Sequence, residues 1–293
     1  MKTTYFPDKF IEKYKYFCKN EWGEFFTTIQ IKQPKSFWVN SNLTNKKEVE
    51  KNLNDLNIKF QNYPFHNFAY GIDYPNPGQL ELFKSAKISI QEKASMLPVI
   101  ALNPTNQDYV LDACASPGTK TIQLSNFSKK VKATDVNSKR IEILNYNKKK
   151  YNLKNVEVVR ADVRNVKDTF DKILLDAPCS SEGLVRKDFD ALKEWTPKLV
   201  LEKARLQKEI LIYCFDLLKY GGQMVYSTCS FAPEENEDVV NFLMQKREDA
   251  TVEKINLDGI KIRYNPLCEN YVRLWPQDNN TQQFGFCLIS KKD

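Results

Sequence analysis

Short apolar runs alternate with longer helical patterns from Tyr109 onward, and this alternation limits the possible folds. The runs end in "YVLDACA", "VKATDV", "VEVVRAD", "KILLDAP" and "MVYSTCS", and helical patterns over 138–152 and 198–220 lie between them. Alternation of this kind predicts an α/β doubly wound sheet. The runs show little polar alternation, which suits strands buried on both faces. Gly221 and Gly222 follow the second helical pattern and are expected to end it.

The C-terminal part predicts a further helix over 235–247 and closing strands at 261–265 and 284–290. The closing strands are expected to form an antiparallel edge.

The first 80 residues have a different pattern of apolar and polar residues. They predict a small α+β domain over residues 1–80, followed by a larger domain over residues 81–293. Strands are expected at 36–43 and 58–65, with a helix between them that carries Val49, Leu53 and Leu56 at helical spacing. The segment 71–80 contains proline and glycine and is interpreted as the linker, and 88–102 as a helix packed on the larger domain.

Composition excludes several classes of protein. No apolar run approaches the ~20 residues of a membrane span, so a cytoplasmic protein is expected. The seven cysteines lack the spacing of a disulfide framework or a zinc site, so we expect free thiols and no metal. Cys18, Cys214, Cys268 and Cys287 are interpreted as buried hydrophobic residues.

The single histidine, His66, lies in an aromatic-rich stretch and is expected to be structural. Chemistry that pairs a nucleophile with an imidazole base is therefore not expected. The net charge of +7 favours a polyanionic partner only weakly.

Acidic residues follow three consecutive predicted strands, at Asp112, Asp135 and Asp162. Ligands of open α/β sheets bind at the carboxyl ends of the strands, where Asp135 can accept from ribose hydroxyls and Asp162 from an adenine amine. The turn after the first strand, "DACASPGTKT", lacks the glycines of the phosphate-binding loops. The pattern therefore favours an adenosine-bearing cofactor without phosphates, and S-adenosylmethionine (SAM) is the natural candidate.

The segments "QEKASMLPVIAL", "DACASPGTKT", "DAPCSSEGLVRKD" and "STCSFAPEENEDVV", in this order, closely resemble the NOL1/NOP2/Sun (RsmB/RsmF-like) RNA cytosine-C5 methyltransferases. The resemblance implies a Rossmann-like SAM-dependent methyltransferase domain preceded by a small RNA-recognition-like α+β domain. It also implies methylation of cytosine C5 in structured RNA, with rRNA favoured and tRNA possible. A ribosomal subunit is a further candidate partner.

The resemblance also assigns site residues by matching position. The family's nucleophile matches Cys229, and the cysteine that assists product release matches Cys179. The family's cofactor contacts match Cys114, Ala115, Ser116, Pro117, Gly118, Thr119, Lys120, Asp135, Asp162 and Asp176, with Arg140 as a further carry-over. Thr119, Ser116 and Gln277 depart from residues that are usual in the family, and the last of these puts local RNA contacts in question.

The chemistry requires a cysteine because C5 of cytosine becomes nucleophilic only after a thiolate adds to C6. An ordinary thiol has a pKa of about 8.5, so the site must favour the thiolate of Cys229. Lys120 and the cofactor's sulfonium are the electrostatic candidates for that role. Asp176 is expected to supply a proton or hydrogen bond at N3 of the base, from an environment that raises its pKa.

The target base must be single-stranded or flipped out before a thiol can reach C6. Arg186, Lys187, Trp195 and Arg273 lie close to the active-site motifs and are the candidates for the RNA-binding face. Pro233, Glu234 and Asn236 are interpreted as shaping the Cys229 loop.

Two alternatives remain. One is a ribosome-assembly protein that binds RNA and SAM without turnover. The presence of Asp176, Cys179 and Cys229 favours the enzyme over this alternative. The other is DNA cytosine methylation, in which Cys179 would be the nucleophile and Cys229 incidental.

Overall fold

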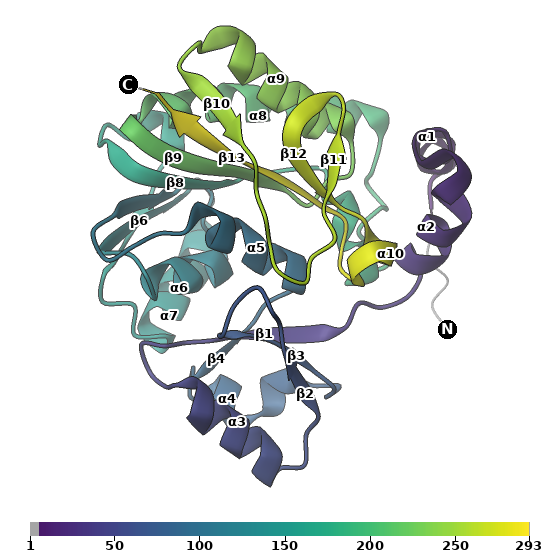
Figure 1. Cartoon of the computed structure of the whole chain (residues 1–293). Coiled ribbons are helices and arrows are strands. Elements are labelled where there is room, and N and C mark those ends of the chain that lie inside the picture. The colour runs from purple at the N-terminus through teal and green to yellow at the C-terminus, as the bar shows by residue number, and fades with distance from the viewer. Residues whose placement is uncertain (1–5, 293) are drawn as a thin grey trace.

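A computed structural model describes residues 6–292, so residues 1–5 of the expected small domain and residue 293 lie outside the described part. The molecule has a large lobe built on one twisted sheet and a small lobe built on another (Figure 1). The order of the large sheet is β11-β12-β13-β9-β8-β5-β6-β7, with β10 paired to β13. Within this sheet, the strands from β5 to β9 are all parallel to one another, as expected for a doubly wound sheet.

The elements of the large lobe have the following bounds. Its strands are β5 (Tyr109–Asp112), β6 (Lys130–Asp135), β7 (Val156–Arg160), β8 (Phe170–Asp176), β9 (Leu218–Thr228), β10 (Ala250–Glu253), β11 (Arg263–Asn265), β12 (Cys268–Leu274) and β13 (Phe284–Lys291). Its helices are α5 (Lys93–Leu102), α6 (Thr119–Ser125), α7 (Ser138–Lys150), α8 (Pro197–Asp216), α9 (Glu237–Lys246) and α10 (Pro276–Asn279).

The closing strands are antiparallel as expected, but β13 is not at the edge. It lies between β9 and β12, with Phe286 opposite Ser227 and Val272. Phe286, Cys287 and Ile289 are buried, so this strand needs cover on both faces and along both sides.

The predicted stop of the long helix at Gly221 and Gly222 is wrong. Helix α8 ends at Asp216, and both glycines lie within β9. Gly221 has a φ of 72°, and the pairing of β8 with β9 shifts register nearby. The glycines therefore lie at an irregularity in the strand pairing, where the backbone needs a residue that can adopt a left-handed conformation.

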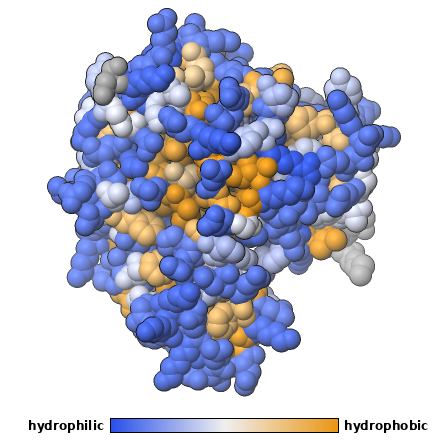
Figure 2. Space-filling view, viewed as in Figure 1, coloured by the Kyte–Doolittle hydropathy of each residue, from blue (hydrophilic) through white to orange (hydrophobic). Residues whose placement is uncertain are grey.

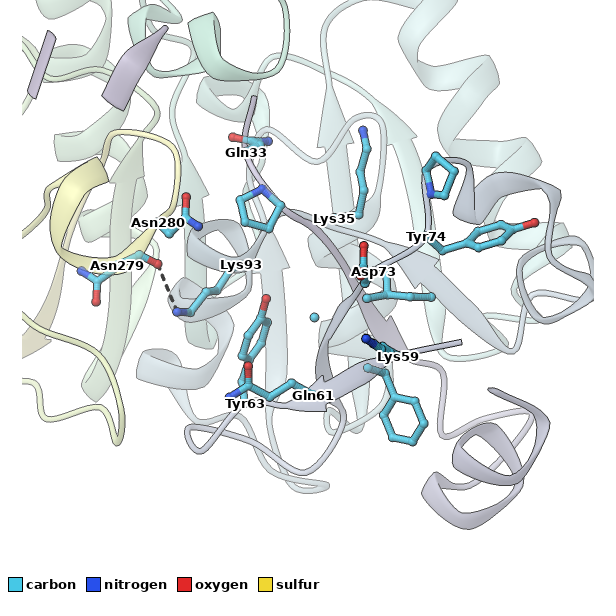
Figure 3. A pocket seen from close by; sticks show the side chains of 15 residues that line it. Gln33, Lys35, Lys59, Gln61, Tyr63, Asp73, Tyr74, Lys93, Asn279 and Asn280 are labelled. Atoms are coloured by element: carbon cyan, nitrogen blue, oxygen red, sulfur yellow. Dashed lines mark hydrogen bonds between the residues drawn. The ribbon is translucent and has the colours of Figure 1, made fainter. Parts of the chain in front are cut away.

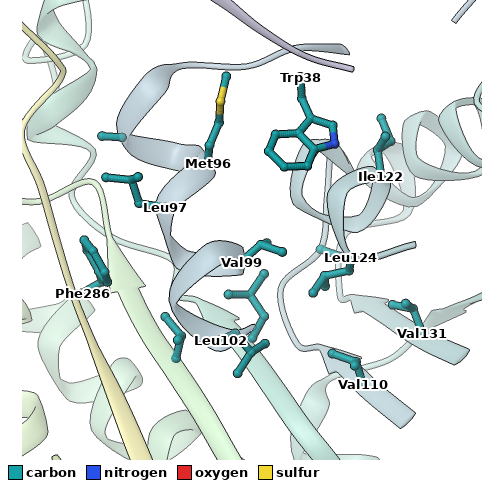
Figure 4. Close-up of a cluster of buried hydrophobic side chains, with 14 of the residues drawn as sticks. Trp38, Met96, Leu97, Val99, Leu102, Val110, Ile122, Leu124, Val131 and Phe286 are labelled. Atoms are coloured by element: carbon teal, nitrogen blue, oxygen red, sulfur yellow. The ribbon is translucent and has the colours of Figure 1, made fainter. Parts of the chain in front are cut away.

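Apolar side chains cover both faces of the large sheet. One cluster includes Met96, Leu97, Val99 and Leu102 of α5, packed against strands of the sheet (Figure 4). The other face packs on α8 and α9. The low polarity that the sequence shows in these strands is explained by this double cover.

The small lobe contains an antiparallel sheet with the strand order β2-β3-β1-β4, and α3 covers it. Its elements are β1 (Lys35–Val39), α3 (Lys46–Asp55), β2 (Phe60–Asn62), β3 (Ala69–Ile72), α4 (Glu81–Lys84) and β4 (Ile88–Ile90). The expected helix over 88–102 is thus a strand followed by α5, and 71–72 belongs to β3 rather than to a linker. The sheet extends past the expected boundary at residue 80 because β4 pairs with β1.

The helices α1 (Asp8–Cys18) and α2 (Trp22–Ile29) precede the small sheet but pack on the large lobe (Figure 1). Phe10, Tyr14 and Phe25 join a buried cluster with Phe231 and Trp275. The first 80 residues are therefore divided between two structural units, which differs from the single small domain expected.

The small lobe is also fixed to the large one through Trp38. This side chain is fully buried in the large-lobe core, and its Nε1 donates to Asn126 Oδ1 over 2.8 Å. His66 stacks on Trp38 with ring centroids 4.7 Å apart, and burial lowers the pKa of His66. His66 is therefore structural, as expected.

The four cysteines interpreted as hydrophobic residues are all buried: Cys18, Cys214, Cys268 and Cys287. Over residues 6–292, none of the helices combines the length and apolar character that crossing a membrane requires.

Candidate active site

A cavity of about 740 Å³ opens at the carboxyl ends of β5, β6, β7 and β8. Several of the predicted site residues line it: Cys114, Ser116, Asp135, Arg140, Asp162, Asp176, Cys179 and Cys229. Ala115, Pro117, Gly118, Thr119 and Lys120 are not among the lining residues, although Lys120 contacts Asp176 of the cavity wall. The sheet thus brings together acids and thiols that are up to 115 residues apart, since Cys114 and Cys229 share this cavity.

The turn after β5 is fixed by the sheet and by α7. Ala115 N donates to Thr134 O over 2.9 Å, and Arg140 donates to Ser116 O. Gly118 has a φ of 105°, and a Cβ there would lie 2.6 Å from Leu144 Cδ1. Only glycine therefore fits this position, whereas Thr119 begins α6 without strain, so the departure at Thr119 leaves the turn intact.

Asp135 has an acceptor atom that the protein leaves free. Its Oδ1 accepts from Asn137 N over 2.9 Å, but its buried Oδ2 has no hydrogen-bond partner among the described residues. Arg140 Nη2 lies 3.4 Å from Oδ2 and supplies charge only. A buried carboxylate oxygen without a donor is costly, so this atom fits a ligand hydroxyl.

Asp162 is held at the rim of the same cavity. Arg164 pairs with it over 2.7 Å, and this hydrogen bond lowers the pKa of Asp162. The carboxylate also accepts from Arg164 N over 2.9 Å. Asp162 is therefore an oriented, charged acceptor.

Asp176 receives two donors from the protein. Lys120 Nζ lies 2.5 Å from Oδ2, and Ser227 Oγ donates to Oδ1 over 2.8 Å. The Lys120 side chain is 10% exposed, so its ammonium is largely withdrawn from water. Asp176 is expected to supply a proton or hydrogen bond at N3 of the base, but here both of its carboxylate oxygens accept, from Lys120 and from Ser227.

Cys179 and Cys229 lie in direct contact, with their sulfur atoms 3.0 Å apart. The hydrogen bond to Cys229, together with burial, raises the pKa of Cys179 well above its usual value. This raised pKa favours the protonated thiol of Cys179, and either sulfur can be the donor in the contact. Gly183 permits this contact, because it donates to Cys229 O over 2.7 Å and a Cβ there would lie 2.6 Å from that oxygen.

Two buried carboxylates that the sequence reasoning missed brace the loops of these cysteines. Glu182 is fully buried and accepts from Tyr14 Oη over 2.5 Å and from Trp195 Nε1 over 2.5 Å. It also accepts from Phe231 N over 3.0 Å, two residues after Cys229. Glu182 thus joins α1 to both cysteine loops.

Glu235 is the second brace. It accepts from Ser180 N over 2.9 Å, from Ser230 Oγ over 2.8 Å and from Gln207 Nε2 over 2.8 Å. Burial raises the pKa of Glu235. Ser180 and Ser230 directly follow the two cysteines, so Glu235 sets the distance between the thiols. The acids inside "CSSEG" and "PEENE" were the available signal for both braces.

Of the three residues expected to shape the Cys229 loop, Asn236 has the direct contacts. Its side chain donates to Ser230 O over 3.0 Å and accepts from Thr228 Oγ1 over 2.6 Å. Pro233 begins a 3-10 turn, and Glu234 pairs with Lys13 over 2.9 Å.

The predicted RNA-binding face is mostly wrong, because three of its four residues are buried. Arg186 is 2% exposed and donates to Ile31 O, Thr281 O and Asn280 Oδ1. Trp195 is 3% exposed and bound to Glu182. Only Lys187 is exposed.

Arg273, the remaining candidate, is also internal. It forms a two-pronged ion pair with the fully buried Glu237, including Nε to Oε1 at 2.6 Å. Phe17 and Phe231 lie against its guanidinium at 5.1 and 4.9 Å. The sequence could not reveal these partners, since they come from α1, α9 and the Cys229 loop.

We expect Arg273→Met to destabilise the fold by about 3–5 kcal/mol, because it leaves Glu237 buried without a partner. Urea denaturation measures the loss. Lys187→Met is the control, because Lys187 belongs to the same predicted RNA-binding face but is exposed. It should change the free energy of unfolding by less than about 0.5 kcal/mol. Equal stability of the two variants would contradict the assignment of Arg273 as structural.

Gln277, the other departure from the family pattern, lies in α10. The residue is partly buried, but its side-chain nitrogen and oxygen are both buried, and neither has a hydrogen-bond partner among the described residues. Within residues 6–292, no group of histidine, cysteine, aspartate or glutamate side chains has the arrangement of a metal site.

A family model and several known proteins are similar to this chain in sequence. A family described as "16S rRNA methyltransferase RsmB/F" matches residues 99–289. A tRNA (cytosine(49)-C(5))-methyltransferase of Pyrococcus abyssi is 33% identical, over 97% of this chain and 96% of its own length. A ribosomal RNA small subunit methyltransferase F of Vibrio parahaemolyticus is also 33% identical, over 98% of this chain and 63% of its own length.

Among solved structures, a methyltransferase homolog protein from Pyrococcus horikoshii superposes with a TM-score of 0.84 at 27% identity. The match covers 98% of this chain and 96% of that one. By contrast, the chain spans only 44 to 64% of the small subunit methyltransferase F relatives that it matches.

Proposed function

Since the chain belongs to the 16S rRNA methyltransferase RsmB/F family, the family that the sequence motifs indicated, we propose that it transfers a methyl group from SAM to C5 of a cytosine in RNA. The observation that carries this proposal is the pair of thiols of Cys179 and Cys229, 3.0 Å apart at the edge of the cavity. Two thiols in contact beside strand-end acids suit a reaction that makes and then breaks a bond to sulfur.

The residues of the cavity fit the cofactor. Asp135 Oδ2 would accept from a ribose hydroxyl, and Asp162 would accept from the adenine amine. When bound, SAM supplies an electrophilic methyl group. Asp162 and Asp176 add negative charge to a cavity that would hold a positive sulfonium.

The protein's own part in the reaction begins with Cys229. Its thiolate adds to C6 of cytosine, and the electron pair moves toward N3, where Lys120 can donate a proton held against Asp176. C5 then has the electron density to accept the methyl group. Water then takes the C5 proton, and the electron pair of that bond re-forms the C5–C6 double bond as the bond between sulfur and C6 breaks. N3 gives its proton back to Lys120, and Cys179 donates a proton to the departing Cys229 sulfur.

Both rRNA and tRNA remain candidate substrates. The names of the relatives include both classes, and the full-length match is to a tRNA enzyme. We favour small-subunit rRNA, because the family description names it. DNA methylation with Cys179 as nucleophile has less support, because the hydrogen bond to Cys229 and burial raise the pKa of Cys179 and disfavour its thiolate.

The test is methyl transfer from labelled SAM to RNA from cells that lack the protein. The small-subunit rRNA and tRNA fractions are digested separately, and 5-methylcytidine is identified by mass spectrometry. Label in either fraction supports the enzyme and names the substrate class. RNA binding without transfer to any fraction would favour the ribosome-assembly alternative, and transfer only to DNA the other one.

We expect Asp135→Ala to weaken SAM binding by about 10- to 100-fold. Loss of a buried charged acceptor costs about 1–3 kcal/mol. Isothermal titration of SAM measures the change. The control is Asp168→Ala, which removes an exposed carboxylate paired with Lys132 away from the cavity. Unchanged SAM affinity of Asp135→Ala would refute its role in cofactor binding.

A further inference from the structure

A second cavity, of about 750 Å³, lies where the small lobe meets the chain around α10 (Figure 3). Its lining includes Lys35 and Lys59 of the small lobe and Asn279 and Asn280 of the large one. The small lobe presents mostly hydrophilic residues on the face shown in Figure 2. The volume is within the range of about 300–1,000 Å³ that is usual for ligand pockets.

The charge of this second cavity is positive. Lys35, Lys59 and Lys93 line it, against Asp73 as its acidic lining residue. Lys35 and Lys59 are exposed, and neither forms an ion pair within residues 6–292. Lys93 Nζ donates to Asn279 O over 3.2 Å and lies 4.9 Å from the ring centre of Tyr63. The site thus offers unpaired cations to an anion.

Aromatic and amide side chains accompany the lysines. Tyr63 and Tyr74 line the cavity, and Gln33 Oε1 is buried there without a hydrogen-bond partner. A Cβ at Gly71 would lie 2.7 Å from Tyr63 Oη, so the glycine leaves room for this ring. Rings, amides and cations together match the base and phosphate of a nucleotide better than an acidic peptide, which needs only the cations.

The wall of the second cavity is attached to the active-site loop through Arg186. Its Nη2 donates to Asn280 Oδ1 over 2.7 Å, and its carbonyl accepts from Gln33 N over 3.3 Å. Arg186 ends the 3-10 turn that follows the Cys179 loop. A ligand held between Gln33 and Asn280 would therefore sit at a fixed position relative to the two thiols.

We propose that the second cavity binds a nucleotide of the substrate RNA outside the target cytosine, with Lys35 and Lys59 on its phosphates and Tyr63 and Tyr74 beside its base. This inference rests on the proposed function for its choice of RNA. Because the cavity combines parts of both lobes, it would fix which nucleotide reaches Cys229. It is a separate site from the cofactor cavity, and it shares none of that cavity's lining residues.

The test compares the full-length wild type with Lys35→Gln/Lys59→Gln. Fluorescence anisotropy measures binding of a labelled 12-nucleotide oligocytidine at several salt concentrations. We expect about a tenfold loss of affinity and a salt slope smaller by about 1.4, since each single-strand phosphate contact contributes about 0.7. Lys47→Gln/Lys51→Gln is the matched control, because it removes the same charge from α3, outside the cavity.

A second variant, Tyr74→Ala, tests the base contact and should weaken RNA binding about 5- to 100-fold while SAM affinity stays unchanged. Equal losses in the cavity and control double variants, or no loss in the cavity variant, would overturn the proposal. Tighter binding of a labelled poly-glutamate peptide than of the RNA, lost in the cavity double variant, would point to an acidic protein instead. Saturable binding of cytidine monophosphate that does not compete with the RNA would assign the cavity to a free nucleotide.

Methyl transfer separates this inference from the proposed function. If the wild type methylates RNA, Lys35→Gln/Lys59→Gln should raise KM for RNA and leave kcat unchanged. If the wild type does not methylate RNA but the cavity variant still loses affinity, the cavity stands and the catalytic proposal fails.

Discussion

Cys229→Ala is expected to abolish methyl transfer, with a loss on the order of 10⁴-fold or more, as for removal of other covalent nucleophiles. Without the thiolate of Cys229, the bond from sulfur to C6 does not form, and C5 stays too poor in electrons to accept a methyl group. The fold should survive, because Cys229 is only partly buried and the braces Glu182 and Glu235 bind its neighbours rather than its sulfur.

Two measurements check this result. Transfer of label from SAM to RNA should disappear, and a denaturing gel should show no protein–RNA adduct. SAM affinity should stay within about twofold of wild type, which separates lost chemistry from lost cofactor binding. Substantial residual transfer by Cys229→Ala would remove it from the role of nucleophile. Cys268→Ala is the control for loss of a thiol, since Cys268 is buried at β12, away from the cavity.

Cys179→Ala is expected to do the opposite on the gel: the covalent adduct should accumulate, while turnover falls on the order of 10²–10⁴-fold, the usual contribution of a positioned proton donor. The reason is geometric. The sulfur of Cys179 lies 3.0 Å from the Cys229 sulfur, and the hydrogen bond to Cys229 and burial raise the pKa of Cys179, which favours its protonated form. Its removal leaves bond formation intact and deprives the departing sulfur of its donor.

The double variant gives the decisive control for Cys179. Cys179→Ala/Cys229→Ala should show no adduct, because accumulation requires the nucleophile. An adduct that persists in the double variant would belong to another residue. If instead the adduct is lost in Cys179→Ala and present in Cys229→Ala, the two roles are exchanged and the DNA-type assignment of the nucleophile gains support.

Much of the grouping of the candidate site residues could be predicted from the sequence, because it depends on which residues follow the strands. Parallel strands place their carboxyl ends at one edge, so Asp135, Asp162 and Asp176 could be predicted to meet from strand order alone. The cysteines in "DAPCSS" and "STCS" follow strands of the same sheet for the same reason. Apolar runs without polar alternation likewise predicted strands covered on both faces.

The errors fall where a distant segment decides the outcome. Gly221 looked like a helix end, but the pairing of β8 with β9 makes it part of a strand. The segment 88–90 looked helical, yet β1 was available to pair with it. Local patterns carry no information on such partners, because strand pairing is set by residues far away in the sequence.

The sequence by itself determined the sheet, the acids at its edge and the two thiols, since these depend on residue type and on the order of elements along the chain. Only the tertiary structure decided that Arg186 and Arg273 face inward, that α1 supports the cysteine loops through Tyr14, and that Lys120 contacts Asp176. The physical reason is burial. From sequence alone an arginine is predicted to lie on the surface. It can be buried only when a carboxylate or carbonyl from another element pairs with its charge, and only packing brings that partner into contact.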